Sequence, residues 1–167
     1  VIAIALAANP RLIIADEPTT ALDVTIQAQI LKLMENLVKK FGSALILVTH
    51  DLAVVSEMTH RVVVMYCGKI VEEAPTAELI RAPRHPYTKG LLGSIPRITG
   101  VRTPRLPQIP GMAPHLFDLP KGCSFAPRCG YATERCRAEV PAMRELSAGR
   151  RAACHNPVST EKRTAGN

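Results

Sequence analysis

Two adjacent carboxylates, Asp16 and Glu17, directly follow the apolar run from Leu12 to Ala15. A short apolar run of this kind is typical of a buried strand, and α/β sheets hold their ligands at the carboxyl ends of their strands. Burying carboxylates is costly unless they meet a cation or do chemistry. One acid can hold a Mg²⁺ ion through water, and the other can point toward a nucleophile. The alternative is a strand that merely ends in a polar turn.

A histidine follows a second apolar run at what we expect to be the same edge of the sheet. Residues 44–49 are apolar on both faces, which is typical of a central parallel strand, and His50 comes next. Parallel neighbours would bring His50 to the edge that carries Asp16 and Glu17. A lone histidine after a strand is more often structural than functional, so the residues alone leave both interpretations open.

Four of the five cysteines fall within 32 residues, namely Cys123, Cys129, Cys136 and Cys154. Four thiolates can hold a 4Fe–4S cluster or a tetrahedral zinc ion. No interval is the two-residue gap of zinc ribbons, which weakens zinc without excluding it. Nearby arginines favour thiolates and would offset an anionic centre, so they support a metal over free thiols; they are Arg128, Arg135, Arg137, Arg150 and Arg151. Unligated thiols are the alternative.

Capping residues and periodicity predict the elements that position these groups. Asp23 is placed to cap a helix that ends before Gly42, and Asp51 is placed to cap a second helix to about residue 59. The first helix should present one apolar stripe, formed by Ile26, Ile30, Leu33 and Leu37. Residues 61–73 read as a hairpin turning at Cys67, followed by a short helix from 75 to 81. Residues 84–92 read as a capped helix, and residues 96–122 as a proline-rich connector without regular structure.

Composition divides the chain. Residues 1–95 hold nine basic and nine acidic residues, so the net charge of +7 resides in residues 96–167. Nucleic-acid binding is one interpretation of a basic tail, but aromatic platforms are scarce there and we do not favour it. No run is long and apolar enough for a membrane span, and no basic flank precedes the first apolar stretch as in a signal peptide. The uncapped helical start at Val1 predicts an N-terminally truncated chain.

The run Leu12-Ile13-Ile14-Ala15-Asp16-Glu17-Pro18-Thr19-Thr20-Ala21-Leu22-Asp23 resembles the Walker B motif and D-loop of ATP-binding-cassette ATPases. Val48-Thr49-His50-Asp51 resembles their H-loop. The resemblance implies an α/β fold with a P-loop NTPase (RecA-like) cassette core. It also implies that Asp16 holds Mg²⁺ of MgATP, that Glu17 orients or deprotonates the attacking water, that His50 contacts the γ-phosphate, and that Asp23 meets a partner subunit.

Two further stretches narrow the resemblance. Arg84-His85-Pro86-Tyr87-Thr88-Lys89-Gly90 is similar to the His-Pro-Tyr segment of ATPases that energise oligopeptide, dipeptide and nickel import. The cysteine pattern, with Gly122 before Cys123 and His155 after Cys154, resembles the C-terminal cluster extension of some of these proteins. That resemblance implies a 4Fe–4S cluster held by Cys123, Cys129, Cys136 and Cys154, with zinc as the alternative and His155 as a neighbour.

The predicted organisation is the C-terminal part of a cassette at 1–82, an irregular cysteine-containing extension at 83–157 and a disordered tail at 158–167. The resemblance implies a second ATPase subunit, two membrane permeases and an external solute-binding protein as partners. It also implies a peripheral location at the cytoplasmic face of the inner membrane, reached only through the permeases. Neither a Gly-x-x-x-x-Gly-Lys-Ser/Thr loop nor the Ser-Gly-Gly signature is present, so we expect this chain alone to lack ATPase activity. A non-transport cassette ATPase, such as an accessory subunit of phosphonate breakdown, is the alternative function.

Overall fold

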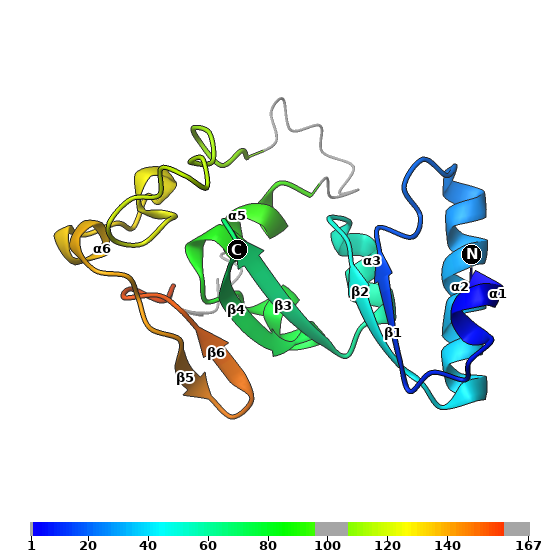
Figure 1. Cartoon of the computed structure of the whole chain (residues 1–167). Coiled ribbons are helices and arrows are strands. Elements are labelled where there is room, and N and C mark those ends of the chain that lie inside the picture. The colour runs from blue at the N-terminus through cyan, green and yellow to red at the C-terminus, as the bar shows by residue number, and fades with distance from the viewer. Residues whose placement is uncertain (1, 96–106, 159–167) are drawn as a thin grey trace, which may run out of the picture. The chain divides into compact units, whose positions relative to one another are not determined.

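The computed structural model describes residues 2–95 and 107–158, and its mixed α/β chain forms two compact units, residues 1–59 and 60–167 (Figure 1). The predicted helix near the N-terminus is α1 (Ile2–Leu6). Part of the predicted connector, residues 96–106, and nearly all of the predicted disordered tail lie outside the described residues. The two compact units meet between residues 59 and 60, before the hairpin. The domain boundary predicted from the sequence lies at residue 82. It separates the cassette from its extension, and it stays a prediction.

The first unit is built on a β-α-β crossover. Strands β1 (Leu12–Asp16) and β2 (Ala44–Val48) pair in parallel, with Leu12 opposite Ala44 and Asp16 opposite Val48. Helix α2 (Val24–Phe41) connects them, and α3 (Leu52–Met58) follows β2. The register therefore puts the ends of both strands, and the residues that follow them, at one edge of the sheet.

Helix α2 begins and ends at the predicted capping residues. The Oδ1 atom of Asp23 accepts the backbone N–H of Ile26 at 3.0 Å, and Gly42 takes the left-handed conformation at φ 64°. The predicted stripe differs from the face that is buried: Leu31 and Met34 are buried, while Ile26 and Leu33 are about 40% and 45% exposed. The four-three-four spacing correctly identified an apolar face of α2. This face is only partly buried, because the two-stranded sheet and α1 offer too little surface to cover it.

The second unit contains a four-stranded antiparallel sheet in the order β3-β4-β6-β5. Strands β3 (Arg61–Tyr66) and β4 (Lys69–Pro75) form the predicted hairpin. Helices α4 (Thr76–Arg81) and α5 (Pro86–Gly93) follow it, and after the connector come a 3₁₀ turn (Ala126–Arg128) and α6 (Glu134–Ala138). Strands β5 (Arg144–Ser147) and β6 (Arg150–Ala152) complete the sheet and were not predicted.

Pairing of β6 with β4 joins the cysteine-containing segment to the hairpin. Glu73 lies opposite Arg151 in this pairing, and their side chains form an ion pair. The carboxylate of Glu73 also accepts from Arg61 of β3 at 2.6 Å. One acidic side chain thus bridges β3 and β6 across β4, which offsets the unfavourable neighbourhood of the two arginines.

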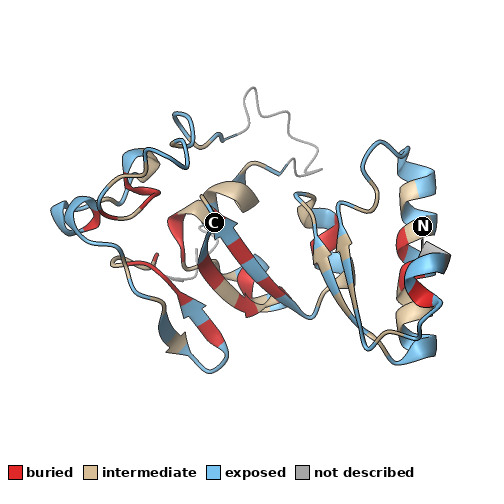
Figure 2. Cartoon of the chain, in the orientation of Figure 1, coloured by how far each residue is buried: buried red, intermediate tan, exposed pale blue. Residues whose placement is uncertain are grey.

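The core of the second unit lies on one face of β3 and β4. Val62, Val64 and Tyr66 alternate with exposed residues along β3, as the two-residue period of a strand requires (Figure 2). Tyr66 packs against Tyr87 and Phe125, with ring centroids 4.7 and 5.3 Å away. This aromatic cluster connects β3, α5 and the start of the cysteine-containing segment. Among the described residues, no helix has the length and apolar character to cross a membrane.

Candidate functional site

The structure brings Glu17 and His50 into direct contact at the carboxyl ends of β1 and β2. The backbone N–H of Glu17 donates to the Val48 carbonyl at 2.8 Å, which continues the pairing one residue past β1. Glu17 then takes a left-handed φ of 42°, an unusual conformation for a residue with a side chain. Its Oε1 lies 3.0 Å from Nδ1 of His50, and its Oε2 accepts the hydroxyl of Thr20 at 2.8 Å.

These contacts keep Glu17 ionised. The hydrogen bond from His50 lowers the pKa of the Glu17 carboxyl most, and the Thr20 hydroxyl lowers it further. The side chains of Glu17 and His50 are 45% and 81% exposed, so the pair is open to solvent. An ionised carboxylate beside an imidazole can accept a proton from water or orient it, which is the chemistry expected of a general base.

The other two predicted residues of this edge have different surroundings. Asp16 ends β1 with an exposed side chain, and no hydrogen bond or ion pair to it is present among residues 2–95 and 107–158. Its carboxylate is therefore available to a cation. Asp23 uses Oδ1 to cap α2, and its expected place at a subunit interface stays a prediction.

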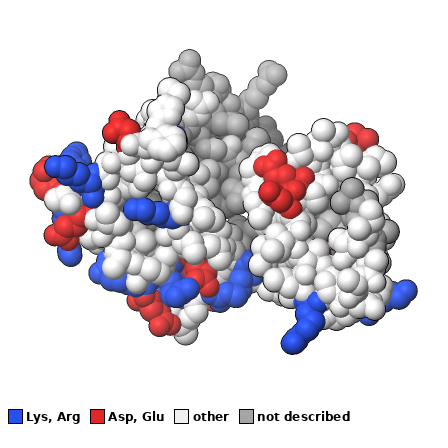
Figure 3. Space-filling view, viewed as in Figure 1, with Lys and Arg blue, Asp and Glu red and all other residues white. Residues whose placement is uncertain are grey.

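Charge differs between the two units. The first holds four basic and six acidic residues, and the second holds 17 basic and eight acidic residues. In Figure 3 most of the Lys and Arg on view accordingly lies over the second unit. The excess of positive charge therefore lies in the unit that contains the cysteines.

All four predicted cysteines line one pocket in the second unit. The pocket has a free volume of about 10 Å³, close to one water-sized sphere, and His85, Phe125 and Asn156 also line it. A single ion would displace the thiols less than a four-iron cluster would. Within the described residues, however, no three His, Cys, Asp or Glu side chains stand in an arrangement that holds a metal ion. The four thiols thus line the same pocket, but they are not arranged as a complete set of metal ligands.

Burial controls the charge of these thiols. It raises the pKa of Cys123 and Cys129, and raises that of Cys154 to about 11. Backbone N–H groups act in the opposite direction: those of Phe125 and Ala126 donate to Cys123, and those of Tyr131 and Asn156 donate to Cys129 and Cys154. Such donors stabilise thiolates, but burial outweighs them here, so the pKa of each of these three thiols stays raised and the thiols stay neutral unless a cation compensates.

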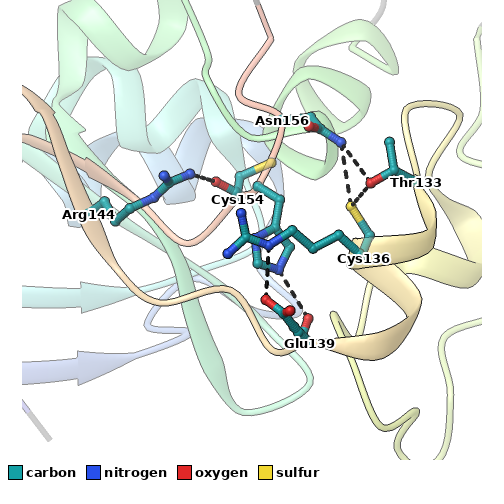
Figure 4. Close-up of polar contacts among 8 residues, drawn as sticks. Thr133, Cys136, Glu139, Arg144, Cys154 and Asn156 are labelled. Carbon is teal, nitrogen blue, oxygen red and sulfur yellow. Dashed lines mark hydrogen bonds and ion pairs between the residues drawn. The ribbon is translucent and has the colours of Figure 1, made fainter.

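The polar contacts of the Cys136 sulfur come from side chains instead. Its sulfur lies 3.4 Å from the Thr133 hydroxyl and 3.5 Å from the Nδ2 atom of Asn156, which also lies within 3.4 Å of Thr133 (Figure 4). Asn156 therefore serves two cysteines, with its backbone N–H at Cys154 and its amide at Cys136. Sequence analysis missed Asn156, because no spacing rule marks a residue that acts through a loop twenty positions away.

The His-Pro-Tyr segment forms part of the same pocket. Its first residue, His85, is buried at 1% exposure, and burial lowers its pKa to about 4. Glu72 of β4, also 1% exposed, accepts the backbone N–H groups of Arg84 and His85 at 2.7 and 2.8 Å. The predicted capped helix is present as α5, with His85 as its N-cap. The His85 side chain is buried and does not lie on the protein surface. Sequence analysis missed Glu72. The one feature of the sequence that could have indicated its role is a carboxylate at a strand position that faces the core.

Residues 71–136 match the family described as "Oligopeptide/dipeptide transporter, C-terminal region". The chain is 52% identical over 157 residues to the dipeptide transport ATP-binding protein DppD of Escherichia coli, covering 94% of this chain and 48% of that protein. Over nearly its whole length the chain is thus similar to a peptide-transport ATP-binding protein. It is also 56% identical over 151 residues to a putative peptide import ATP-binding protein of Brucella ovis, covering 87% of this chain and 45% of that protein.

A third relative matches the chain to a similar extent. The oligopeptide transport ATP-binding protein AppD of Bacillus subtilis is 54% identical over 153 residues, covering 92% of this chain and 46% of that protein. The chain spans about half the length of the curated relatives it matches. The resemblance to peptide-import ATPases predicted from Asp16-Glu17, His50 and His85-Pro86-Tyr87 is thereby confirmed.

Proposed function

We propose that this chain is the C-terminal part of an ATP-binding, ATP-hydrolysing subunit that energises the import of oligopeptides or dipeptides across the cytoplasmic membrane. The observation that carries the proposal is the 3.0 Å contact between Glu17 and His50 at the carboxyl ends of paired parallel strands. The names of its relatives support the same activity. The P-loop NTPase fold of the whole protein is part of the proposal.

Each residue of the site has a proposed task. Asp16 holds the Mg²⁺ of MgATP with its unpaired carboxylate, and Glu17 acts as general base toward the attacking water. His50 contacts the γ-phosphate and holds Glu17 in place, and Asp23 faces the second ATPase subunit. Nearby carboxylates repel, so a cation on one of them leaves the other free to work as the base. The left-handed backbone at Glu17 supports this division, because it turns the chain directly after Asp16.

The test is ATP turnover by the assembled transporter that contains this chain. Glu17→Gln should lower the turnover rate by about 100-fold or more while ATP binding persists, since general bases contribute about 10² to 10⁴. Glu57→Gln is the matched control, because Glu57 is an exposed glutamate on α3. Turnover by Glu17→Gln close to that of Glu57→Gln would refute the assignment. The 167-residue chain alone should show no appreciable turnover.

The proposed partners are a second ATPase subunit, two membrane permeases and an external solute-binding protein. The subunit would then lie at the cytoplasmic face of the inner membrane and contact the membrane only through the permeases. Nucleic acid is not among the proposed partners. Co-purification with permeases is the expected result. Co-purification with a soluble lyase complex instead would favour the alternative function in phosphonate breakdown, and nickel uptake without peptide uptake would favour a nickel importer.

We also propose that Cys123, Cys129, Cys136 and Cys154 hold a metal centre, a 4Fe–4S cluster or else zinc. Support comes from their shared pocket and from the N–H donors at their sulfurs. The bound metal would supply the positive charge that makes four buried thiolates stable. Anaerobic purification with iron, sulfide and zinc analysis tests this: about four irons and four sulfides per chain indicate the cluster, and one zinc indicates a structural ion. Absence of both refutes the metal centre and leaves the ATPase proposal standing.

A further inference from the structure

Each carboxylate oxygen of Glu17 has a contact from a different part of the chain. Its Oε1 lies 3.0 Å from Nδ1 of His50, and its Oε2 accepts the hydroxyl of Thr20 at 2.8 Å. A carboxylate offers about four lone-pair positions, so two donors leave room on each oxygen for a water molecule. The two contacts therefore hold the carboxylate at both oxygens without closing it to a substrate water.

The turn after β1 fixes the place of the Thr20 hydroxyl. The backbone N–H of Thr20 donates to the Glu17 carbonyl at 3.1 Å, and that of Leu22 donates to the Thr19 carbonyl at 3.2 Å. Glu17 and Ala21 take left-handed φ angles of 42° and 64°, which are uncommon for residues with a side chain. Strained backbone of this kind persists only where the surrounding contacts determine it, and it is concentrated at functional sites.

A second contact matters because the Glu17 side chain is 45% exposed. A glutamate side chain that faces water samples many rotamers, and fixing it costs conformational entropy. With His50 as its one partner, the carboxylate would remain free to pivot about a single hydrogen bond, and His50 is itself 81% exposed. A misplacement of about 1 Å can cost about 100-fold in rate, so the position of this carboxylate has to be determined by more than one contact.

We propose that Thr20 is a positioning residue, whose hydroxyl together with the His50 imidazole holds the Glu17 carboxylate in the orientation in which it activates water. The inference rests on the proposed function, in which Glu17 is the general base. In this role Thr20 acts through Glu17 and needs no contact of its own with the nucleotide. Serine can therefore replace it, whereas valine, which has the shape of threonine without the hydroxyl, cannot.

The first test is steady-state ATP turnover by the assembled transporter that contains this chain. Thr20→Val should lower kcat about tenfold and leave the KM for ATP within about twofold of wild type, because the change affects the base and not nucleotide binding. Thr20→Ser keeps a donor to the carboxylate and should stay within about threefold of wild type. Thr25→Val is the matched control, because Thr25 is an exposed threonine in the first turn of α2, outside the turn that follows β1.

A double variant separates positioning of the base from a general effect on folding or assembly. If Thr20 acts through Glu17, adding Thr20→Val to Glu17→Gln should change the residual turnover by less than about twofold, because the base is already removed. A further loss of about tenfold in the Glu17→Gln background would show that Thr20 acts independently of Glu17 and would overturn the inference.

Carbon-13 NMR of the Glu17 carboxyl gives a readout that does not depend on turnover. The hydrogen bond from His50 lowers the pKa of Glu17 most, and the Thr20 hydroxyl is the next largest cause. Thr20→Val should therefore raise this pKa toward its ordinary value, and Thr20→Ser should not. An unchanged pKa in Thr20→Val would overturn the inference.

The outcomes for Thr20 and for the proposed function can be told apart. Thr20→Val with the turnover of Thr25→Val, beside a defective Glu17→Gln, would overturn the assignment of Thr20 alone. Glu17→Gln with the turnover of Glu57→Gln would overturn the proposed base and the inference with it.

Discussion

Replacing Glu72 by alanine removes the acceptor of two backbone N–H groups that precede α5. The carboxylate is 1% exposed and accepts from His85 at 2.8 Å in a buried bond and from Arg84 at 2.7 Å in a partly buried one. Hydrogen bonds to charged groups contribute about 1.5–3 kcal/mol each, and an orphaned buried donor costs about 1–3 kcal/mol. Counting the buried bond in full and the other in part, we expect Glu72→Ala to lower the free energy of unfolding by about 3–5 kcal/mol.

Tyrosine fluorescence during urea unfolding measures this loss of stability in the second unit of the chain. The chain has no tryptophan, and its three tyrosines, Tyr66, Tyr87 and Tyr131, all belong to the second unit. With an unfolding slope of about 2 kcal/mol per molar urea, the midpoint should fall by about 2 M. Glu72→Gln should lose less, because its amide oxygen still accepts one of the two N–H groups.

Glu73→Gln is the matched control for this experiment. Glu73 is the next residue of β4 and points to the other face, where its 15% exposed side chain pairs with the half-exposed side chains of Arg61 and Arg151. Exposed ion pairs contribute about 0.2–1 kcal/mol each, so this variant should lose about 1 kcal/mol. The reasoning fails if Glu72→Ala unfolds within about 1 kcal/mol of wild type, or if Glu73→Gln loses as much.

Two further predictions concern the same unit. A Cβ on Gly122 would collide with the Cys136 carbonyl and lie 2.5 Å from the carbonyl oxygen of Arg137. Gly122→Ala should therefore cost about 2–3 kcal/mol of unfolding free energy in thermal melts, while Gly130→Ala, with open space around its Cβ, serves as control; equal losses would contradict the close approach. The ion pairs of Glu73 lower its pKa below 4.5, first through Arg151 and then Arg61. Their contribution is complete above pH 4.5 and is lost as the pH falls through the lowered pKa, so the stability gap between wild type and Glu73→Gln should shrink in acid. A gap that widens in acid would refute this sign.

The elements with local signals were predictable. Asp23, Gly42 and Asp51 mark helix ends by their own capping chemistry, and the apolar run before Asp16 marks a strand without reference to distant residues. Contact between Glu17 and His50 could be anticipated because parallel strands share an edge. Their catalytic tasks remain predictions, as does metal binding by the cysteines.

The features that depend on distant partners were not predictable. Strands β5 and β6 are short and charged, and β6 becomes a strand because β4 offers an edge and Glu73 offers a partner for Arg151. Burial of His85 likewise depends on Glu72, thirteen residues earlier, and on the aromatic ring of Phe125. Such contacts follow from tertiary packing, which neither periodicity nor capping encodes.

Pairing of β4 with β6 has a consequence for synthesis of the chain. Glu73 and Arg151 are 78 residues apart, so the hairpin emerges from the ribosome well before its third strand exists. At about 5–20 residues per second, the edge of β4 waits about 4–16 s for β6. During this interval the edge presents unpaired N–H and C=O groups, which can pair with another nascent chain. Pairing with β6 thus protects the edge of β4 from this association.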